Sequence, residues 1–151
     1  MIIGVCGFIG SGKDTVADYL VNFHEFRRES FADTLKDAVA SVFGWDRTLL
    51  EGRTKEAREW REEVDIWIAS LENKIRNSKD DIIVSDVRFP NEVKAIKNQQ
   101  GKMIMVQRGR LPKWYDVALD ANSGSNVAIN ELKIQNIHAS EWAWVGTKFD
   151  H

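Results

Sequence analysis

The sequence contains a single cysteine, Cys6, among its 151 residues, so no disulfide can form within the chain. A reducing compartment fits this cysteine usage. No apolar stretch approaches the roughly 18 residues that a membrane-spanning helix needs. The first ten residues hold three glycines and no basic residue, which argues against a signal peptide. We therefore expect a cytoplasmic protein without a membrane partner.

A strong excess of one charge is also missing. Lys and Arg number 21 against 23 Asp and Glu, which gives a formal net charge of −2. Because proteins that bind duplex nucleic acid usually carry a basic patch, we expect no duplex partner. The sequence has no Cys–His cluster with zinc-ligand spacing and no Ser–His–Asp arrangement typical of hydrolases. A chain of this length is expected to form one domain, residues 1–151.

Short apolar runs alternate with stretches of helical spacing along the chain. The runs predict strands within 1–6, 25–31, 81–85 and 103–107. Helical spacing predicts helices over 13–23, after an N-cap at Asp33, over 53–77 and from Pro90. We expect residues 108–125 to be irregular and residues 126–144 to be partly helical. Strands that alternate with helices predict an α/β fold with a parallel sheet.

Residues 7–13 (GFIGSGK) fit the motif G-x-x-x-x-G-K, the Walker A motif or P-loop. The motif follows a predicted strand and opens a predicted helix, which is the context it requires. Its glycines let the backbone wrap around a phosphate, and the helix N-terminus adds positive potential. Lys13 supplies a mobile positive charge for β- and γ-phosphates. The stretch therefore predicts a nucleotide-phosphate site.

Asp14 stands where Ser or Thr usually holds Mg²⁺, and Thr15 follows it. A carboxylate can approach Mg²⁺ directly or through water, but it adds negative charge beside a triphosphate. Asp86, directly after the predicted strand 81–85, is a further metal candidate. We therefore take Asp14, Thr15 and Asp86 as candidate magnesium ligands.

Polar side chains follow two of the predicted strands, at the edge where ligands of open parallel sheets bind. Asp86 could bind Mg²⁺ through water or accept a hydrogen bond from a substrate there; the alternative is that it caps the next turn. Arg88 suits bidentate phosphate recognition. Arg108 and Arg110 follow the fourth strand. Phosphoryl transfer needs cations around the migrating group, so these two arginines are lid candidates.

Four stretches of the chain resemble phage-type deoxynucleoside monophosphate kinases. They are residues 7–15 (GFIGSGKDT), 30–38 (SFADTLKDA), 86–92 (DVRFPNE) and 138–142 (HASEW), and they are spread over nearly the whole chain. The resemblance implies a P-loop kinase fold, a three-layer α/β/α arrangement with a central parallel sheet flanked by helices. It also implies phosphorylation of deoxynucleoside monophosphates to diphosphates, with ATP and Mg²⁺. A phage origin would place the protein in the host cytoplasm.

The resemblance also implies roles for individual residues. ATP would be bound by Gly10, Ser11, Gly12, Lys13, Asp14 and Thr15. The acceptor nucleotide would be bound by Leu35, Lys36, Arg53, Asp86, Arg88 and Glu92. Within these two sets, Lys13, Asp14 and Arg88 would be the catalytic residues. Ser140 and Glu141 match the family pattern less specifically.

Two other functions stay open. A related small-molecule kinase, such as a dephospho-coenzyme A kinase, typically has Ser or Thr at the position of Asp14. A non-catalytic nucleotide-binding module is the other. Family members carry a segment rich in nucleotide-binding residues before the part that matches residues 65–68, whereas Val64 runs directly into that part here. A last strand and helix would be expected after residues 149–151. The sequence fixes neither the preferred base nor the oligomeric state, and a homodimer stays open.

Overall fold

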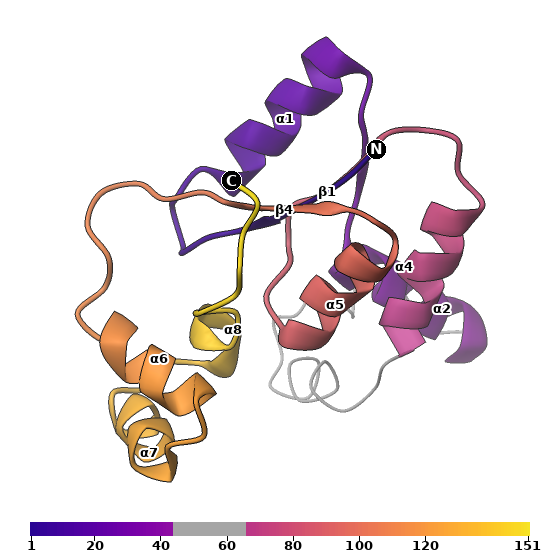
Figure 1. The fold of residues 1–151 in the computed structure, drawn as a ribbon. Helices are drawn as coiled ribbons and strands as arrows, with labels where there is room; N and C mark the ends of the chain where they lie inside the picture. The colour runs from indigo at the N-terminus through magenta and orange to yellow at the C-terminus, as the bar shows by residue number, and fades with distance from the viewer. Residues whose placement is uncertain (44–65) are drawn as a thin grey trace.

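A parallel sheet of four short strands organises the computed structural model, which describes residues 1–43 and 66–151. The strands are β1 (Ile2–Cys6), β2 (Arg27–Glu29), β3 (Ile82–Val84) and β4 (Lys102–Met105), in the spatial order β2-β3-β1-β4 (Figure 1). The register places Gly4 of β1 opposite Val84 of β3 and Met103 of β4. The two central strands are almost entirely buried, as expected for strands that are covered on both faces.

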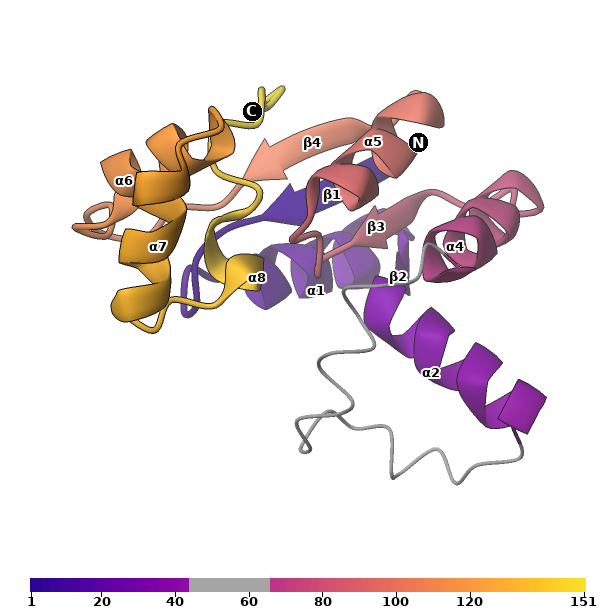
Figure 2. The ribbon, with the colours of Figure 1, turned by 90° about the horizontal axis from the view of Figure 1, so that it is seen from below.

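Helices connect the strands and cover the sheet. They are α1 (Lys13–His24), α2 (Phe31–Phe43), α4 (Ile66–Arg76), α5 (Pro90–Asn98), α6 (Tyr115–Asn122), α7 (Asn126–Ile134) and α8 (Ala139–Trp142). Helix α1 lies on one face of the sheet, and α5 lies on the other beside α4 (Figures 1 and 2). Among the described residues, no helix is both long and apolar enough to span a membrane.

The side chains of the strands alternate between two hydrophobic cores. Ile3 and Val5 of β1 pack with Ala17 of α1 on one face. Ile82 and Val84 of β3 pack on the other face with residues of α4, α5 and α7. This period of two residues is what a sheet covered by helices on both faces requires. The α/β class, the parallel sheet and the flanking helices are therefore confirmed.

The end of the chain runs along the outer edge of β4. The amide of Met105 donates to the carbonyl of His151 at 2.9 Å, and the amide of His151 donates to the carbonyl of Met103 at 3.4 Å. The amide of Met103 donates to the Asp150 carboxylate, which lowers the pKa of that group below its ordinary value. These bonds have the pattern of a parallel pairing. The edge of β4 is thus occupied at this position.

An aromatic cluster ties the C-terminal helices to the phosphate loop. The ring of Phe8, in the loop, lies 5.5 Å from Trp114 and 4.8 Å from Trp144, measured between ring centroids. Asn122, at the end of α6, donates to the carbonyls of Trp142 and Val145 at 3.0 and 2.7 Å. The segment after β4, which contains α6, α7 and α8, therefore packs against the phosphate loop through Trp114 and Trp144.

Several predicted boundaries differ from the structure. The second strand ends at Glu29, and α2 begins at Phe31, so Asp33 lies inside the helix and is not its N-cap. The prediction of an irregular 108–125 is wrong for α6. The predicted helix over 53–77 is observed as α4, and its earlier part lies outside the described residues. Val93 and Ile96 of α5 are buried as predicted.

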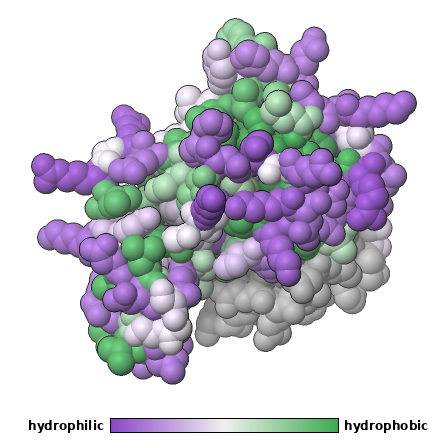
Figure 3. Space-filling view, viewed as in Figure 1, coloured by the Kyte–Doolittle hydropathy of each residue, from purple (hydrophilic) through white to green (hydrophobic). Residues whose placement is uncertain are grey.

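Hydrophobic and hydrophilic side chains are mixed over the surface of α6 and α7 (Figure 3). The exposed fraction of an apolar side chain therefore indicates whether it contributes to the stability of this region. Trp144 is 1% exposed, whereas Val127 of α7 is 78% exposed.

We expect Trp144→Ala to lower the free energy of unfolding by about 3–5 kcal/mol, because it leaves a large cavity beside Phe8. Val127→Ala is the control and should change it by less than about 0.5 kcal/mol. Urea unfolding measures both; a small effect of Trp144→Ala would contradict the packing role.

Candidate functional site

The phosphate loop joins the buried strand β1 to helix α1, as the motif predicts. Gly12 precedes the helix with φ 98°, a left-handed conformation that favours glycine. A Cβ atom on Gly7 would come within 2.4 Å of the Val106 carbonyl oxygen and 2.5 Å of the Ser11 hydroxyl. Side chains at these positions would strain or block the loop. The glycines therefore keep the loop tight against the end of β4.

Donors of the loop gather at the start of α1. Lys13 Nζ donates to the carbonyl oxygens of Gly7 at 2.9 Å and Phe8 at 3.0 Å. Burial, and then the positive charge of Arg88, lower the pKa of Lys13 below its ordinary value. The Ser11 hydroxyl is buried and has no hydrogen-bond partner among the described residues. A phosphate group would supply negative charge to Lys13, so the loop has the chemistry of an anion site.

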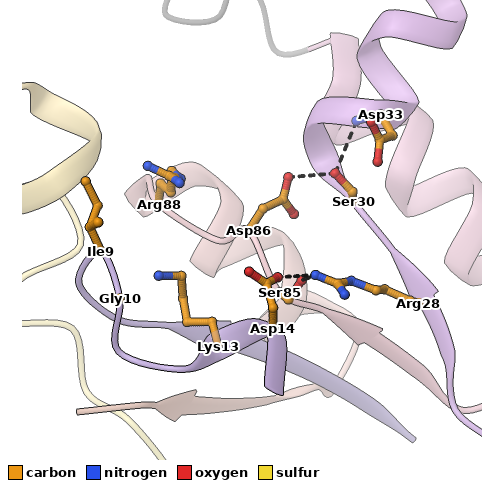
Figure 4. A pocket seen from close by; sticks show the side chains of 10 residues that line it. All are labelled: Ile9, Gly10, Lys13, Asp14, Arg28, Ser30, Asp33, Ser85, Asp86 and Arg88. Carbon is orange, nitrogen blue, oxygen red and sulfur yellow. Dashed lines mark hydrogen bonds and ion pairs between the residues drawn. The ribbon is translucent and has the colours of Figure 1, made fainter. Parts of the chain in front are cut away.

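A cavity of about 380 Å³ opens in front of the loop (Figure 4). Lys13 and Arg88 lie on one side of it, and Arg28 lies on the other beside Asp14 and Ser85. All the lining residues come from the loop, from α1 and from the segments that follow β2 and β3, apart from Arg28 on β2 itself. They are Ile9, Gly10, Lys13, Asp14, Arg28, Ser30, Asp33, Ser85, Asp86 and Arg88. The structure thus brings five predicted site residues together: Gly10, Lys13, Asp14, Asp86 and Arg88.

Arg28 connects β2 to the phosphate loop. Its Nη2 contacts the Asp14 carboxylate and donates to the Ser85 hydroxyl at 2.7 Å, and its Nη1 donates to Asp18 at 3.0 Å. One guanidinium therefore faces two carboxylates and a hydroxyl. Arg28 offsets part of the negative charge that Asp14 brings to the loop, because it pairs with Asp18 as well.

Asp86 joins the end of β3 to the start of α2. Its Oδ2 accepts hydrogen bonds from the Ser30 hydroxyl at 2.8 Å and the Ala32 amide at 3.0 Å, and its Oδ1 accepts from the Phe31 amide at 3.1 Å. The Ser30 hydroxyl in turn accepts from the Asp33 amide at 3.1 Å. Asp86 thus satisfies backbone donors that a helix N-terminus leaves open. It caps α2, a helix far away in the sequence, and still lines the cavity.

Glu92 holds the backbone that carries Arg88. Its Oε2 accepts from the amides of Arg88 at 2.6 Å and Phe89 at 3.0 Å. The Glu92 residue is only 5% exposed and does not line the cavity. The Arg88 guanidinium donates through Nη1 to Glu141 of α8 at 3.1 Å. Glu92 therefore holds the backbone at Arg88 in place through hydrogen bonds. Its direct contact with a substrate stays a prediction.

The other predicted residues lie outside the cavity lining or outside the described part of the chain. Lys36 Nζ lies 3.5 Å from Asp33 Oδ1, one turn along α2. Arg108 and Arg110 are exposed in the segment after β4 and are not among the residues that line the cavity. Their roles stay predictions.

Ser11, Gly12 and Thr15 belong to the loop and to the first turn of α1, without lining the cavity. Leu35 belongs to α2 by its backbone, and its side chain lies outside what the structure describes. Arg53 falls outside the described residues altogether.

Neither a reactive thiol nor a preformed metal cluster is found at the site among the described residues. Burial raises the pKa of the Cys6 thiol to about 12, so this side chain stays neutral and is a poor nucleophile. Within residues 1–43 and 66–151, no three His, Cys, Asp or Glu side chains are grouped so that they could hold a metal ion by themselves. The roles of Asp14, Thr15 and Asp86 as magnesium ligands therefore stay predictions.

Five cavity residues were not among the predicted site residues: Ile9, Arg28, Ser30, Asp33 and Ser85. Ser85 and Ser30 directly follow strands, so the rule that ligands bind at the carboxyl edge could have found them. That rule does not select Arg28, because it lies within β2 and not after its end. The strand Arg27–Glu29 is entirely charged, so no alternation of apolar and polar residues indicates which arginine faces the loop.

No protein-family model matches the chain. A protein of Acanthamoeba polyphaga mimivirus named "Putative deoxynucleotide monophosphate kinase" is 28% identical over 173 aligned residues, which cover 91% of this chain and 86% of that protein. The similarity therefore extends far beyond the phosphate loop. The alignment is longer than the 151 residues of this chain, so parts of the relative stand opposite gaps. The similarity supports a relationship to a kinase family.

The cap formed by Asp86 can be tested without any ligand. We expect Asp86→Ala to lower the free energy of unfolding by about 1–2 kcal/mol, because the amides of Phe31 and Ala32 lose their acceptor. Asp33→Ala is the comparison variant, since Asp33 lies in the same first turn and pairs with Lys36, whereas the amides of Phe31 and Ala32 donate to Asp86. Urea denaturation measures both variants. Equal stability of Asp86→Ala and the unmodified protein would contradict the cap.

Proposed function

We propose that this chain transfers the γ-phosphate of ATP to deoxynucleoside monophosphates and so forms the diphosphates. The observation that carries the proposal is the cavity in which Lys13 of the phosphate loop and Arg88 after β3 converge. Phosphoryl transfer depends on positioning two phosphates and compensating their charge. Lys13 would contact the phosphates of ATP and Arg88 the phosphate of the acceptor. The similarity to the mimivirus protein supports the same reaction and substrate class.

The loop side of the cavity suits the phosphates of ATP. Lys13 lines the cavity at the N-terminus of α1, and its ammonium group and the open backbone amides there match a group with many acceptor oxygens. The carboxylates of Asp14 and Asp86 offer the hard oxygen ligands that Mg²⁺ prefers. Asp14 is the nearer of the two to the loop in sequence and would hold the ion there. When bound, Mg²⁺ supplies positive charge to the β- and γ-phosphates.

The segments that follow β2 and β3 suit the acceptor phosphate. Arg88 follows β3, the strand beside β1, and its guanidinium can hold two phosphate oxygens as a fork. Such a contact orients the attacking oxygen toward the γ-phosphorus, and orientation contributes strongly to a reaction between two bound substrates. Asp86, Ser30 and Asp33 line the same cavity and provide acceptors for hydroxyl or amino groups of a nucleoside.

The proposal is tested by an ADP-release assay on the whole chain with a panel of acceptors. The panel contains the four deoxynucleoside monophosphates, their ribose counterparts and dephospho-coenzyme A. Transfer to one or more deoxynucleotides supports the proposal. Transfer to dephospho-coenzyme A alone would assign the protein to the related class of kinases. Binding of ATP without transfer to any acceptor would indicate a nucleotide-binding module.

Lys13 should be required for the reaction. It compensates charge on the β- and γ-phosphate oxygens as the bond to the γ-phosphorus breaks, and loss of one such contact costs on the order of 10²–10³ in rate. We expect Lys13→Ala to lose that much in kcat in the ADP-release assay. Lys94→Ala removes an exposed lysine of α5 and serves as the control. Near-normal turnover of Lys13→Ala would rule out transfer at this loop.

Asp14 should make the binding of ATP depend on Mg²⁺. Without the ion its carboxylate repels a triphosphate, and with the ion it becomes a ligand. We expect the gain in ATP affinity on adding Mg²⁺ to be roughly tenfold larger for the unmodified chain than for Asp14→Ser. Asp18→Ser is the matched control, because Asp18 also contacts Arg28 but does not line the cavity. Calorimetry gives the affinities; an equal gain for Asp14→Ser would place the metal elsewhere.

A further inference from the structure

Arg88 is held at both ends by glutamates from two different helices. Glu92 of α5 accepts its backbone amide at 2.6 Å, and Glu141 of α8 accepts its Nη1 at 3.1 Å. The Arg88 side chain is 38% exposed and that of Glu141 is 19% exposed, so the ion pair is partly shielded from water. Partly buried ion pairs are screened by salt less than exposed ones. This shielding allows the contact to fix the direction of the guanidinium.

Helix α8 is itself fixed in place, although it has only four residues. The His138 side chain accepts the amide of Ser140 at 3.2 Å, and Asn122 of α6 donates to the carbonyl of Trp142. Trp144, directly after the helix, is fully buried against Phe8 of the phosphate loop. The contacts of Asn122 and Trp144 therefore fix the position of α8 relative to the phosphate loop.

The charges around Glu141 indicate more than a surface ion pair. Lys13 and Arg88 are both cationic and lie near each other, and Arg88 lowers the pKa of Lys13. Glu141 acts on Lys13 in the opposite direction. One carboxylate thus offsets the repulsion between two cations that line the same cavity. Arg88 lines the cavity and uses only Nη1 for its contact with Glu141, so this ion pair leaves Nε and Nη2 as further donors.

We propose that Glu141 is a positioning residue for Arg88, and that it directs the guanidinium toward the phosphate of the acceptor nucleotide. This inference rests on the proposed function, because it concerns the acceptor half of the same site. Helix α8 thereby takes part in acceptor binding, because it carries Glu141, the carboxylate that orients the Arg88 guanidinium. A role that is only structural would instead affect both substrates through stability.

A double-mutant cycle tests the proposal. The specificity constant kcat/KM for the deoxynucleoside monophosphate is measured at saturating ATP for the unmodified chain, Glu141→Gln, Arg88→Ala and the double variant. We expect Arg88→Ala to lose at least about tenfold, since it removes a charge-assisted contact. Glu141→Gln should lose about tenfold in the presence of Arg88 and less than about twofold in the Arg88→Ala background, because directly contacting residues couple.

Controls separate positioning from stability. Glu131→Gln removes an exposed carboxylate of α7 that contacts only Gln135 in the described part of the chain, and it should leave both substrates unaffected. Glu141→Asp keeps the charge on a shorter side chain and should recover part of the loss. For Glu141→Gln we expect the KM for ATP to change by less than about twofold, and urea unfolding shows whether the variant is folded under assay conditions.

The outcomes distinguish the two proposals. Equal losses from Glu141→Gln with and without Arg88, or parallel losses for ATP and acceptor, would overturn the positioning role while leaving the kinase function intact. No transfer by the unmodified chain to any deoxynucleotide would overturn the proposed function, and the role of Glu141 in it would fall at the same time.

Discussion

The site depends on the parallel alignment of β2, β3 and β1 as neighbours. Parallel strands bring their carboxyl ends to one edge, and each of these strands is followed there by a polar segment. The phosphate loop follows β1, Ser85 to Arg88 follow β3, and Ser30 follows β2. Because the register of the sheet is set by apolar residues that alternate between two cores, a shift by one residue would exchange buried and exposed faces. Hydrophobic packing therefore determines which polar groups meet.

Each cation of the cavity has a partner when no ligand is considered. Lys13 contacts the carbonyls of its own loop, Arg28 contacts Asp14 and Asp18, and Arg88 contacts Glu141. Three positive charges can lie close together because acceptors from several elements compensate them. Negatively charged substrates would compete with these acceptors.

Local patterns in the sequence predict much of this arrangement. The apolar run of β1 followed by the glycines and Lys13 predicts the strand, the loop and α1, and Pro90 predicts the start of α5. Helix α6 was missed because its fully buried residues are the small Ala118 and Ala121, which form no clear apolar stripe. Pro112 and Gly124 flank that helix and do not interrupt it.

Contacts between distant segments could not be predicted in the same way. Asp86 and Phe31 are 55 positions apart, and Arg88 and Glu141 are 53 apart. A local rule selects a capping residue near α2 in sequence, and Ser30 does accept the amide of Asp33. The acceptor for the amides of Phe31 and Ala32 comes instead from Asp86 after β3, which lies nearby because β2 and β3 pair. The sequence does not predict Arg28 as a site residue for a related reason. Its contact with Asp14 depends on how β2 lies beside β3 and α1 in the folded chain.

The packing of Phe8 has a consequence for observing the protein. The ring sits inside the phosphate loop and touches the indoles of Trp114 and Trp144. Any rearrangement of the loop changes the surroundings of these two indoles, whose emission is sensitive to nearby charge and water. The molecule therefore carries a built-in optical reporter at its phosphate loop, and events there can be followed in real time without attaching a dye.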